Sequence, residues 1–205
     1  MKHLPRDARV ARPWKNGGGT TREVAVSPEG AGLDDFAWRI SLAELHEAGA
    51  FSSYPGVSRT LLLLEGEPVR LDIDGEAVEL VRGGEAVHFD GGARVFASPA
   101  GVALDAGVMS RDARCRQHCR LMTLSGEVAL LRSTAQGLML LLDGGPLRVV
   151  ADSGDAILAR HDALRFWPED PAELRLSADG MARVLLAEFV FPGEHTRDGR
   201  VEPTG

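Results

Sequence analysis

The densest group of side chains that can do chemistry lies near the N-terminus, around a run of three glycines. The segment reads Trp14-Lys15-Asn16-Gly17-Gly18-Gly19-Thr20-Thr21-Arg22-Glu23-Val24. Glycines allow positive φ and a close approach of the backbone to a ligand, and their amides can form a concave nest that suits an anion. Taken alone, such a loop is more typical of a glycine-rich turn between two strands. The polar residues that follow at once, which a plain turn does not need, favour a binding site for a small anion.

Further polar residues in the first half of the chain can complete such a site. Arg22, Arg39 and Arg59 can each offer paired N–H donors to a carboxylate, a geometry that lysine does not match. Glu23 can accept a hydrogen bond from a ring N–H of the ligand, or it can hold an arginine in position. Each arginine alone is more often part of a surface ion pair. The side chains that can orient an amide or an imidazole ring are Asn16, Thr21, Ser41 and Ser52.

The sequence offers little support for metal-dependent or nucleophilic catalysis. It contains no His-x-His motif and no Gly-x-Ser-x-Gly motif. Cys115 and Cys119 flank His118, but zinc needs three or four ligands, so a reduced thiol pair is the favoured interpretation. Glu23 and His88 can act as an acid/base pair only if the fold brings them together. We therefore favour a binding protein without metal, cofactor or assigned catalytic residue.

Composition narrows the class of protein. The 205 residues carry a formal net charge of −7, and they are 44% hydrophobic and 26% charged, which is ordinary for a globular protein. The acidic balance argues against nucleic-acid binding, which usually leaves a basic surface. No apolar run approaches the length of a membrane span, and residues 1–7 have no apolar core like that of a signal peptide. The expected location is the cytoplasm, with neither nucleic acid nor membrane as a partner.

Short apolar segments separated by Gly, Pro and Asp turns run along the whole chain and predict an all-β fold. The clearest strand covers residues 36–43, where three large apolar residues alternate with Arg39, Ser41 and Ala43. If the apolar set packs into a core, the second set faces a polar cavity or water. Residues 44–48 are expected to form a helical turn. The Asp74-Gly75 pair predicts a tight hairpin.

The second half of the chain repeats the first. Residues 65–71 align with residues 143–149 at an offset of 78, and residues 85–89 align with residues 162–166 at an offset of 77. Two hairpins with similar turns would also look alike, but two nearly equal offsets favour an internal duplication. The second copy lacks the polar cluster, so function is expected in the first.

These observations predict two related β-barrels. The first covers residues 1–112 and carries the ligand pocket, and the second covers residues 113–192. Residues 193–205 are rich in Gly, Pro and charge, which predicts a loose polar tail.

Four separated stretches resemble the HutD/Ves family and occur in the family's order. They are the glycine segment at 14–24, Trp38-Arg39-Ile40-Ser41-Leu42-Ala43, Gly49-Ala50-Phe51-Ser52-Ser53-Tyr54-Pro55-Gly56 with Arg59, and Asp105 to Met109 followed by Arg111. The resemblance implies a bicupin, that is, two tandem jelly-roll barrels of the RmlC-like cupin type, with a small-ligand pocket. It also adds Met109 to the site. Gly107 stands where the family usually has Asn, so a side-chain amide that can touch the ligand is missing.

For the HutD branch, the resemblance implies an accessory or regulatory role in histidine utilisation. The expected ligand is a small carboxylate such as urocanate, formylglutamate or a related intermediate. The expected ligand-binding residues are Asn16, Gly17, Gly18, Gly19, Thr21, Arg22, Glu23, Arg39, Ser41, Ser52, Arg59 and Met109.

Two alternatives remain open. One is a metal-independent isomerase, epimerase or hydrolase that uses Glu23 and His88. The other is a stress-related interaction protein that docks through the glycine loop. A homodimer formed through an exposed strand edge is compatible with either.

Overall fold

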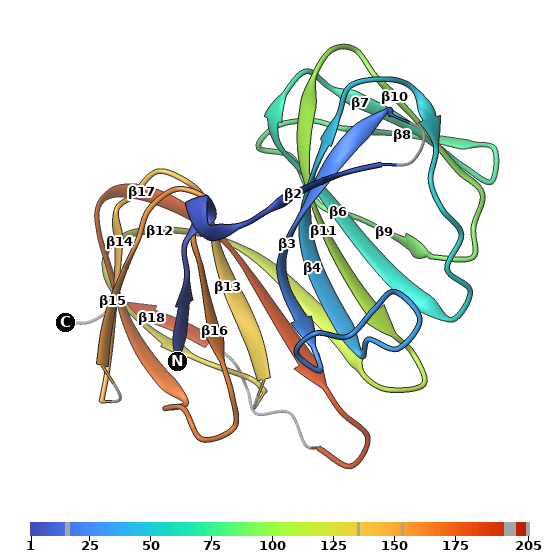
Figure 1. The fold of residues 1–205 in the computed structure, drawn as a ribbon. Coiled ribbons are helices and arrows are strands. Elements are labelled where there is room, and N and C mark those ends of the chain that lie inside the picture. Colours follow the sequence, from blue (N-terminus) through green and yellow to red (C-terminus); the bar gives the residue numbers. More distant parts are fainter. Residues whose placement is uncertain (15–16, 135, 153, 195–199, 204–205) are drawn as a thin grey trace. The chain divides into compact units, whose positions relative to one another are not determined.

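The fold is all-β, and the chain divides into two compact units (Figure 1). The structure is a computed structural model that describes residues 1–14, 17–134, 136–152, 154–194 and 200–203. The N-terminal unit comprises Arg9–Arg116, and the C-terminal unit comprises Met1–Ala8 together with Gln117–Gly205. No helix in the described part of the chain is long and apolar enough to cross a membrane.

The N-terminal unit is built from two antiparallel sheets. A six-stranded sheet has the order β2-β3-β4-β11-β6-β9, and a four-stranded sheet has the order β5-β10-β7-β8. The strands are β2 (Ala11–Pro13), β3 (Gly19–Ser27), β4 (Trp38–Leu45), β5 (Gly49–Ala50), β6 (Val57–Gly66), β7 (Val69–Ile73), β8 (Glu76–Leu80), β9 (Val87–Asp90), β10 (Val95–Pro99) and β11 (Ala103–Arg111).

One apolar cluster joins the two sheets of this unit. Leu45, Leu61 and Leu63 from the six-stranded sheet pack with Val69 and Leu71 from the four-stranded sheet. Because side chains alternate along a strand, every second residue of β4, β6 and β11 points to this side. We call it the inner face of the six-stranded sheet.

The predicted alternation in β4 is confirmed, with the strand shifted two residues toward the C-terminus. Trp38 and Ile40 are fully buried on one side. Arg39, Ser41 and Ala43 are half-buried and lie on the inner face, facing the core instead of open water. The helical turn expected at residues 44–48 is wrong, because β4 continues through Leu45.

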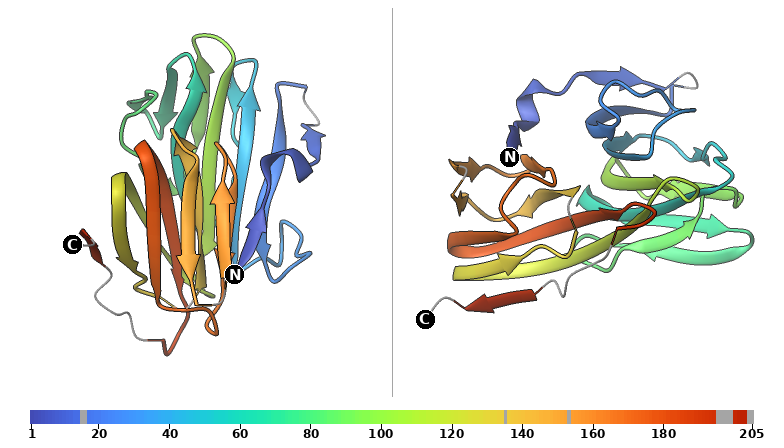
Figure 2. Two further views of the ribbon diagram at one scale, coloured as in Figure 1. Left: turned by 90° about the vertical axis from the view of Figure 1, so that its left-hand side faces the viewer. Right: turned by 90° about the horizontal axis from the view of Figure 1, so that it is seen from below.

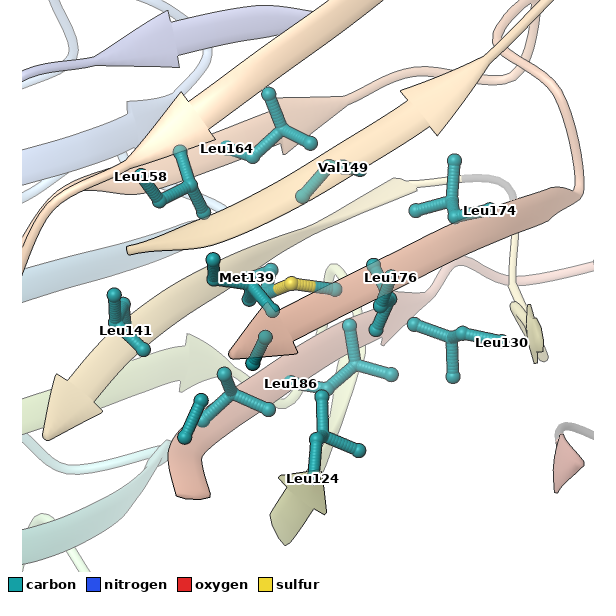
Figure 3. Packing of buried hydrophobic residues seen from close by; sticks show 14 of the residues in the cluster. Leu124, Leu130, Met139, Leu141, Val149, Leu158, Leu164, Leu174, Leu176 and Leu186 are labelled. Carbon is teal, nitrogen blue, oxygen red and sulfur yellow. The ribbon is translucent and has the colours of Figure 1, made fainter. Parts of the chain in front are cut away.

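The C-terminal unit is a single eight-stranded sheet within the described residues, with the path β1-β16-β13-β17-β12-β18 and with β14 paired to β15 and β17. Its elements are β1 (Lys2–Leu4), a short 3-10 helix (Arg6–Ala8), β12 (Arg116–Leu131), β13 (Gln136–Asp143), β14 (Leu147–Ala151), β15 (Gly154–Leu158), β16 (Ala163–Phe166), β17 (Glu173–Val190) and β18 (Arg200–Pro203). Figure 3 shows its core, in which Met139 and Leu186 lie among further leucines.

Both ends of the chain differ from the expected domain ranges. The first eight residues belong to the C-terminal unit, where β1 pairs with β16 (Figure 2). The backbone N–H of Arg6 and the ring of His3 both bond to Asp162, at 2.7 and 2.9 Å, and fasten this segment. Within the expected loose tail, residues 200–203 form a strand that pairs with β12.

The internal repeat is visible in the strand pairing. Where β6 pairs with β11, the register shifts by one residue at Leu64, and where β13 pairs with β17, it shifts at Leu142. These bulges are 78 residues apart, which is the offset of the sequence repeat. Gly66 and Gly144 follow them at the same offset, and both have positive φ. The two units therefore share one local construction.

Candidate functional site

Cross-strand pairing brings two of the expected arginines to the inner face of the N-terminal unit. Met109 of β11 lies opposite Arg39 of β4 on one side and opposite Arg59 of β6 on the other. Directly opposed residues of antiparallel strands point to the same side of a sheet. The Cα atoms of the two arginines are therefore about 10 Å apart, two strand spacings, on one face.

Arg59 is held by aromatic rings. Its guanidinium carbon lies 5.0 Å from the centroid of Phe51, 5.1 Å from that of Phe89 and 5.8 Å from that of Tyr54. The Nη1 group donates to the backbone oxygen of Ser52 over 3.4 Å, and the buried Nε has no partner within the described residues. Burial lowers the pKa of Arg59, an effect that Asp105 and Tyr54 offset in part. The guanidinium thus keeps most of its donors for another acceptor.

Arg39 is positioned by a carboxylate. Its Nε donates to Oε2 of Glu23 over 3.0 Å, and its side chain is only 16% exposed. Glu23 therefore holds the arginine in place, one of the two roles expected for it. The two terminal nitrogens of Arg39 make no other hydrogen bond in the described part of the chain. They are available to a ligand in the fork geometry that suits a carboxylate.

The inner face also carries a buried acid that sequence reasoning did not assign to the site. Asp105 lies between Ala43 and Leu63 and is 4% exposed. Burial raises the pKa of Asp105 to about 7, while Arg59 and the backbone N–H of Ala43 act in the opposite direction. The signal was present in the sequence, because an aspartate stands alone among small and apolar residues over 103–109.

Between the arginine row and Asp105, the inner face has a position without a side chain. Gly107 lies between Ser41 and Leu61 in the pairing of β4, β11 and β6. A Cβ at Gly107 would be 3.3 Å from Cδ2 of Leu61 and 3.8 Å from Oγ of Ser41. We call Glu23, Arg39, Ser41, Arg59, Asp105 and Gly107 the polar layer.

The C-terminal unit shows that this kind of sheet does not need the polar layer. The pairs Leu63–Asp105 and Leu61–Gly107 correspond to Leu141–Val184 and Met139–Leu186. Arg59 likewise corresponds to Gly137, over which the ring of Phe166 packs. Met109 corresponds to Glu188, a buried carboxylate that Ser133 and Arg120 already bond. At the positions of Arg59, Asp105 and Gly107, the second unit therefore carries a different kind of residue.

The glycine loop lies at the other end of the sheet from the arginines. Gly19 pairs with Leu45, six residues along β4 from Arg39, a distance of about 20 Å. A Cβ on Gly19 would be 2.2 Å from the backbone oxygen of Glu44, so this glycine is required by packing. The amide of Gly17 donates to the backbone oxygen of Trp14. Gly17, Gly18 and Gly19 thus do not share a row with the arginines. The close packing against Glu44 is enough to explain why a glycine stands at position 19.

Four other expected residues have distinct places. Thr21 lies on the inner face, where its Oγ1 accepts a hydrogen bond from Nε1 of Trp14 over 2.7 Å. Arg22 lies on the opposite face, because it pairs with Leu42 and bonds Glu44 over 2.5 Å. Ser52 is exposed and contributes its backbone oxygen. Asn16 lies outside the described residues.

The acid/base pair considered from the sequence is not assembled. Glu23 is on the inner face with Ser41, whereas His88 pairs with Thr60 on the opposite face and bonds its hydroxyl over 2.7 Å. No group of three or more His, Cys, Asp or Glu that could hold a metal occurs among the described residues. Cys115 is buried, and its thiol donates to the backbone oxygen of Ala37 over 3.2 Å.

A separate open depression of about 540 Å³ lies on the four-stranded sheet. Asp72, Asp74, Arg94 and Phe96 line it, and it shares Phe51 with the aromatic rings around Arg59. The arginine there is already bonded to Asp74, and both groups are exposed. Its two carboxylates make it a poor place for an anion.

Known proteins similar to this chain include proteins named HutD and Ves, as the four sequence motifs predicted. An uncharacterised 21.2 kDa protein in the hutC 3' region of Pseudomonas putida is 35% identical over 180 residues, covering 87% of this chain and 91% of the relative. Protein Ves of Cronobacter sakazakii is 30% identical over 181 residues, covering 87% and 92%. The structure of HutD from Pseudomonas fluorescens SBW25 superposes with a TM-score of 0.78 at 28% identity, covering 94% of this chain and 99% of that one.

More distant structures show the fold alone. A cupin 2 conserved barrel domain protein from Leptotrichia buccalis superposes with a TM-score of 0.63 at 9% identity, so the fold is cupin-like. The HutD family model matches residues 6–186, which include every described strand from β2 to β16. The chain belongs to the HutD family.

Proposed function

We propose that this chain binds a small carboxylate metabolite on the inner face of the N-terminal unit, between Arg39 and Arg59. The observation that carries this proposal is the state of Arg59. Its guanidinium is surrounded by three rings and has one long hydrogen bond, and its buried Nε has no partner among the described residues. A guanidinium whose buried N–H has no hydrogen-bonding partner is unfavourable, and a bound carboxylate would relieve this cost.

The chemistry of the second arginine supports the same ligand. Glu23 occupies only the Nε of Arg39, so the two terminal nitrogens remain for a bidentate contact. The two arginines carry two positive charges, and Glu23 carries one negative charge. Burial raises the pKa of Asp105 to about 7, so its carboxyl is partly protonated near neutral pH. The solved HutD of Pseudomonas fluorescens is described under a formate condition, and formate is the simplest carboxylate.

In this proposal the protein has an accessory or regulatory role in histidine utilisation. The relative from Pseudomonas putida is named for its position near hutC, and the family is HutD. We infer that the ligand is urocanate, formylglutamate or a related cytoplasmic intermediate, bound without metal or redox cofactor. The repeated bulges at Leu64 and Leu142 support a bicupin, with the first barrel for binding and the second for stability.

Thermal unfolding with a panel of ligands tests the proposal. The panel contains urocanate, formylglutamate, histidine, glutamate and formate, each added to the wild type, to Arg59→Met and to Arg94→Met. Arg94 is the matched control, because it is 90% exposed and lines the depression instead of the polar layer. A ligand at 100 times its Kd adds about 2.7 kcal/mol, which raises the Tm by about 5–10 °C for a chain of this size.

The expected result is a shift in the wild type and in Arg94→Met that is lost in Arg59→Met. The absence of a shift with every carboxylate, in folded protein, would contradict the proposal. A shift abolished by Arg94→Met would move the site to the depression.

A further inference from the structure

Asp105 is a buried acid with unused hydrogen-bonding capacity. It is 4% exposed, and within the described residues its carboxyl accepts one hydrogen bond, from the backbone N–H of Ala43. A carboxylate offers about four acceptor positions, and an ionised group in the interior is stable only when it is paired. Arg59 acts on it through the electrostatic field, with no direct hydrogen bond among the described residues. Among the described residues, the carboxyl therefore has fewer donors than it can accept.

The missing donor has a defined place on the inner face. Along β11, Asp105 and Met109 are four residues apart, about 13 Å between Cα atoms, and Met109 marks the row of the two arginines. Gly107 lies halfway and contributes no side chain, so only the tip of Leu61 and the hydroxyl of Ser41 lie near this point. A ligand held by the arginines at one end would extend over Gly107 toward Asp105.

We propose that Asp105 is a second anchor of this site, and that the ligand is a carboxylate whose far end carries an N–H donor, such as an imidazole or an amide. This inference rests on the carboxylate site proposed above and names the class of its ligand. The ionised carboxyl accepts a charge-assisted hydrogen bond from the ligand N–H, and Ser41 lies between the two anchors on the same face. A simple carboxylate such as formate fills only the arginine end.

Packing does not account for an acid at this position. The corresponding residue of the C-terminal unit is Val184, which is fully buried in an apolar core. An ionised carboxyl costs much more to bury than valine, and burial raises the pKa of Asp105 to about 7. The unit keeps an unfavourable group where its repeat uses an apolar one, as expected of a group that meets a ligand.

Calorimetric titration with a matched pair of probes tests the inference. Urocanate and 3-(2-furyl)acrylate have the same acrylate end and a similar five-membered ring, but only urocanate has a ring N–H. The titrations are made at pH 8 with the wild type, Asp105→Asn, Asp105→Val and Arg59→Met. Valine at this position folds in the repeated unit, so Asp105→Val provides a second readout if the amide variant is poorly folded.

The wild type is expected to bind urocanate about tenfold more tightly than furylacrylate, the value of one charge-assisted hydrogen bond. This ratio should fall below about threefold in both Asp105 variants, while furylacrylate keeps its affinity. Arg59→Met should weaken both probes alike and leave the ratio intact.

Equal binding of the two probes by the wild type would overturn the role of Asp105 and leave the carboxylate site standing. The same holds if the ratio survives in Asp105→Asn and Asp105→Val. Binding of neither probe would overturn both proposals together.

Discussion

At the scale of residues, the N-terminal unit is distinguished by charged groups that its own core does not neutralise. Arg59 has three ring contacts and one long hydrogen bond, and Asp105 has one backbone donor. Burying either group without full pairing destabilises the folded state. Such a cost is typical of binding sites, where the missing partner is the ligand.

The first prediction concerns the pH dependence of stability. Burial raises the pKa of Asp105 from its ordinary value near 4 to about 7, so the folded state binds its proton more tightly than the unfolded state. The stability that this proton provides is complete below about pH 4 and is lost as the pH rises through 7. Asp105→Asn should therefore gain in free energy of unfolding, relative to the wild type, by on the order of 1–4 kcal/mol between pH 4 and pH 8.

Urea unfolding at pH 4, 5, 6, 7 and 8 measures this difference. Three other charged side chains that the structure describes on the inner face, Arg59, Arg39 and Glu23, are unchanged in the variant, as is Arg12, which lies opposite Thr21 on β3. A difference that stays constant with pH would contradict burial of an acid with a raised pKa.

The second prediction concerns the residue that positions Arg39. Glu23→Gln removes the carboxylate that holds the Nε of Arg39, so the arginine loses its orientation and affinity for urocanate should fall about three- to tenfold. Glu44→Gln is the matched control, because it breaks a similar ion pair with Arg22 on the opposite face. Titration calorimetry compares the two variants. An equal loss in both, or a loss only in Glu44→Gln, would show that the ligand does not use the Arg39 side.

At the scale of elements, the sequence predicted several strands and turns, but it did not predict how far apart in space the motifs would lie. The hairpin predicted at Asp74-Gly75 is confirmed, since β7 ends at Ile73 and pairs with β8 across this turn. It was predictable because turn chemistry is local. Gly19 and Glu23 are near neighbours in the chain, yet β3 is extended and carries them to different rows. Arg22 faces away from the arginine row for a related reason, since one step along a strand changes its face.

Four expected residues lie in the polar layer, and for two of them the alternation of β4 already indicated the face. The alternation of β4 put Arg39 and Ser41 on the face opposite the large apolar residues, toward a polar cavity or water, and the structure places both on the half-buried inner face. Asp105 was missed because a single acid in a short apolar strand resembles a turn or edge residue. Asp105 can be assigned to the site only together with Arg59, and the pairing of β11 with β6 is what brings Arg59 to the same face.

The third prediction concerns the bulge shared by both units. A Cβ on Gly66 would be 2.1 Å from the backbone oxygen of Val102, and one on Gly144 would be 2.0 Å from that of Met181. Both glycines also have positive φ. Gly66→Ala and Gly144→Ala should therefore each lower the free energy of unfolding by at least about 2 kcal/mol.

Gly75→Ala is the control for this prediction. Gly75 has positive φ as well, but a Cβ there has nothing within 4 Å, so only the backbone strain of about 1 kcal/mol applies. Urea unfolding measures all three variants. A loss in Gly75→Ala as large as in the other two would remove the argument from close packing.

At the scale of the whole molecule, the two units share a bulged strand pair but differ in the residues of their inner faces. Their bulges and glycines match at the same offset, yet one inner face carries a polar layer and the other a core of leucines (Figure 3). A duplicated fold that keeps its packing in one copy leaves the other copy free to carry a less stable site. The sequence predicted that the polar residues occur in the first copy, and the polar layer lies there.

The fourth prediction follows from the path of the N-terminus. Deletion of residues 1–8 removes β1 from β16 and takes the donors of His3 and Arg6 from Asp162. Hydrogen–deuterium exchange should become faster in β16 and β13, while β4 and β11 keep their protection. The full-length chain with His3→Gln serves as a milder control. Equal loss of protection in both units would contradict the assignment of this segment to the C-terminal unit.

The most direct test of the account is a crystal structure of the protein grown with urocanate at pH 8. We predict density for its carboxylate between the guanidinium groups of Arg39 and Arg59, with the ring over Gly107 and a ring N–H directed at Asp105. Density for the ligand at the glycine loop, or in the depression beside Arg94, with the polar layer filled only by water, would contradict the central claim.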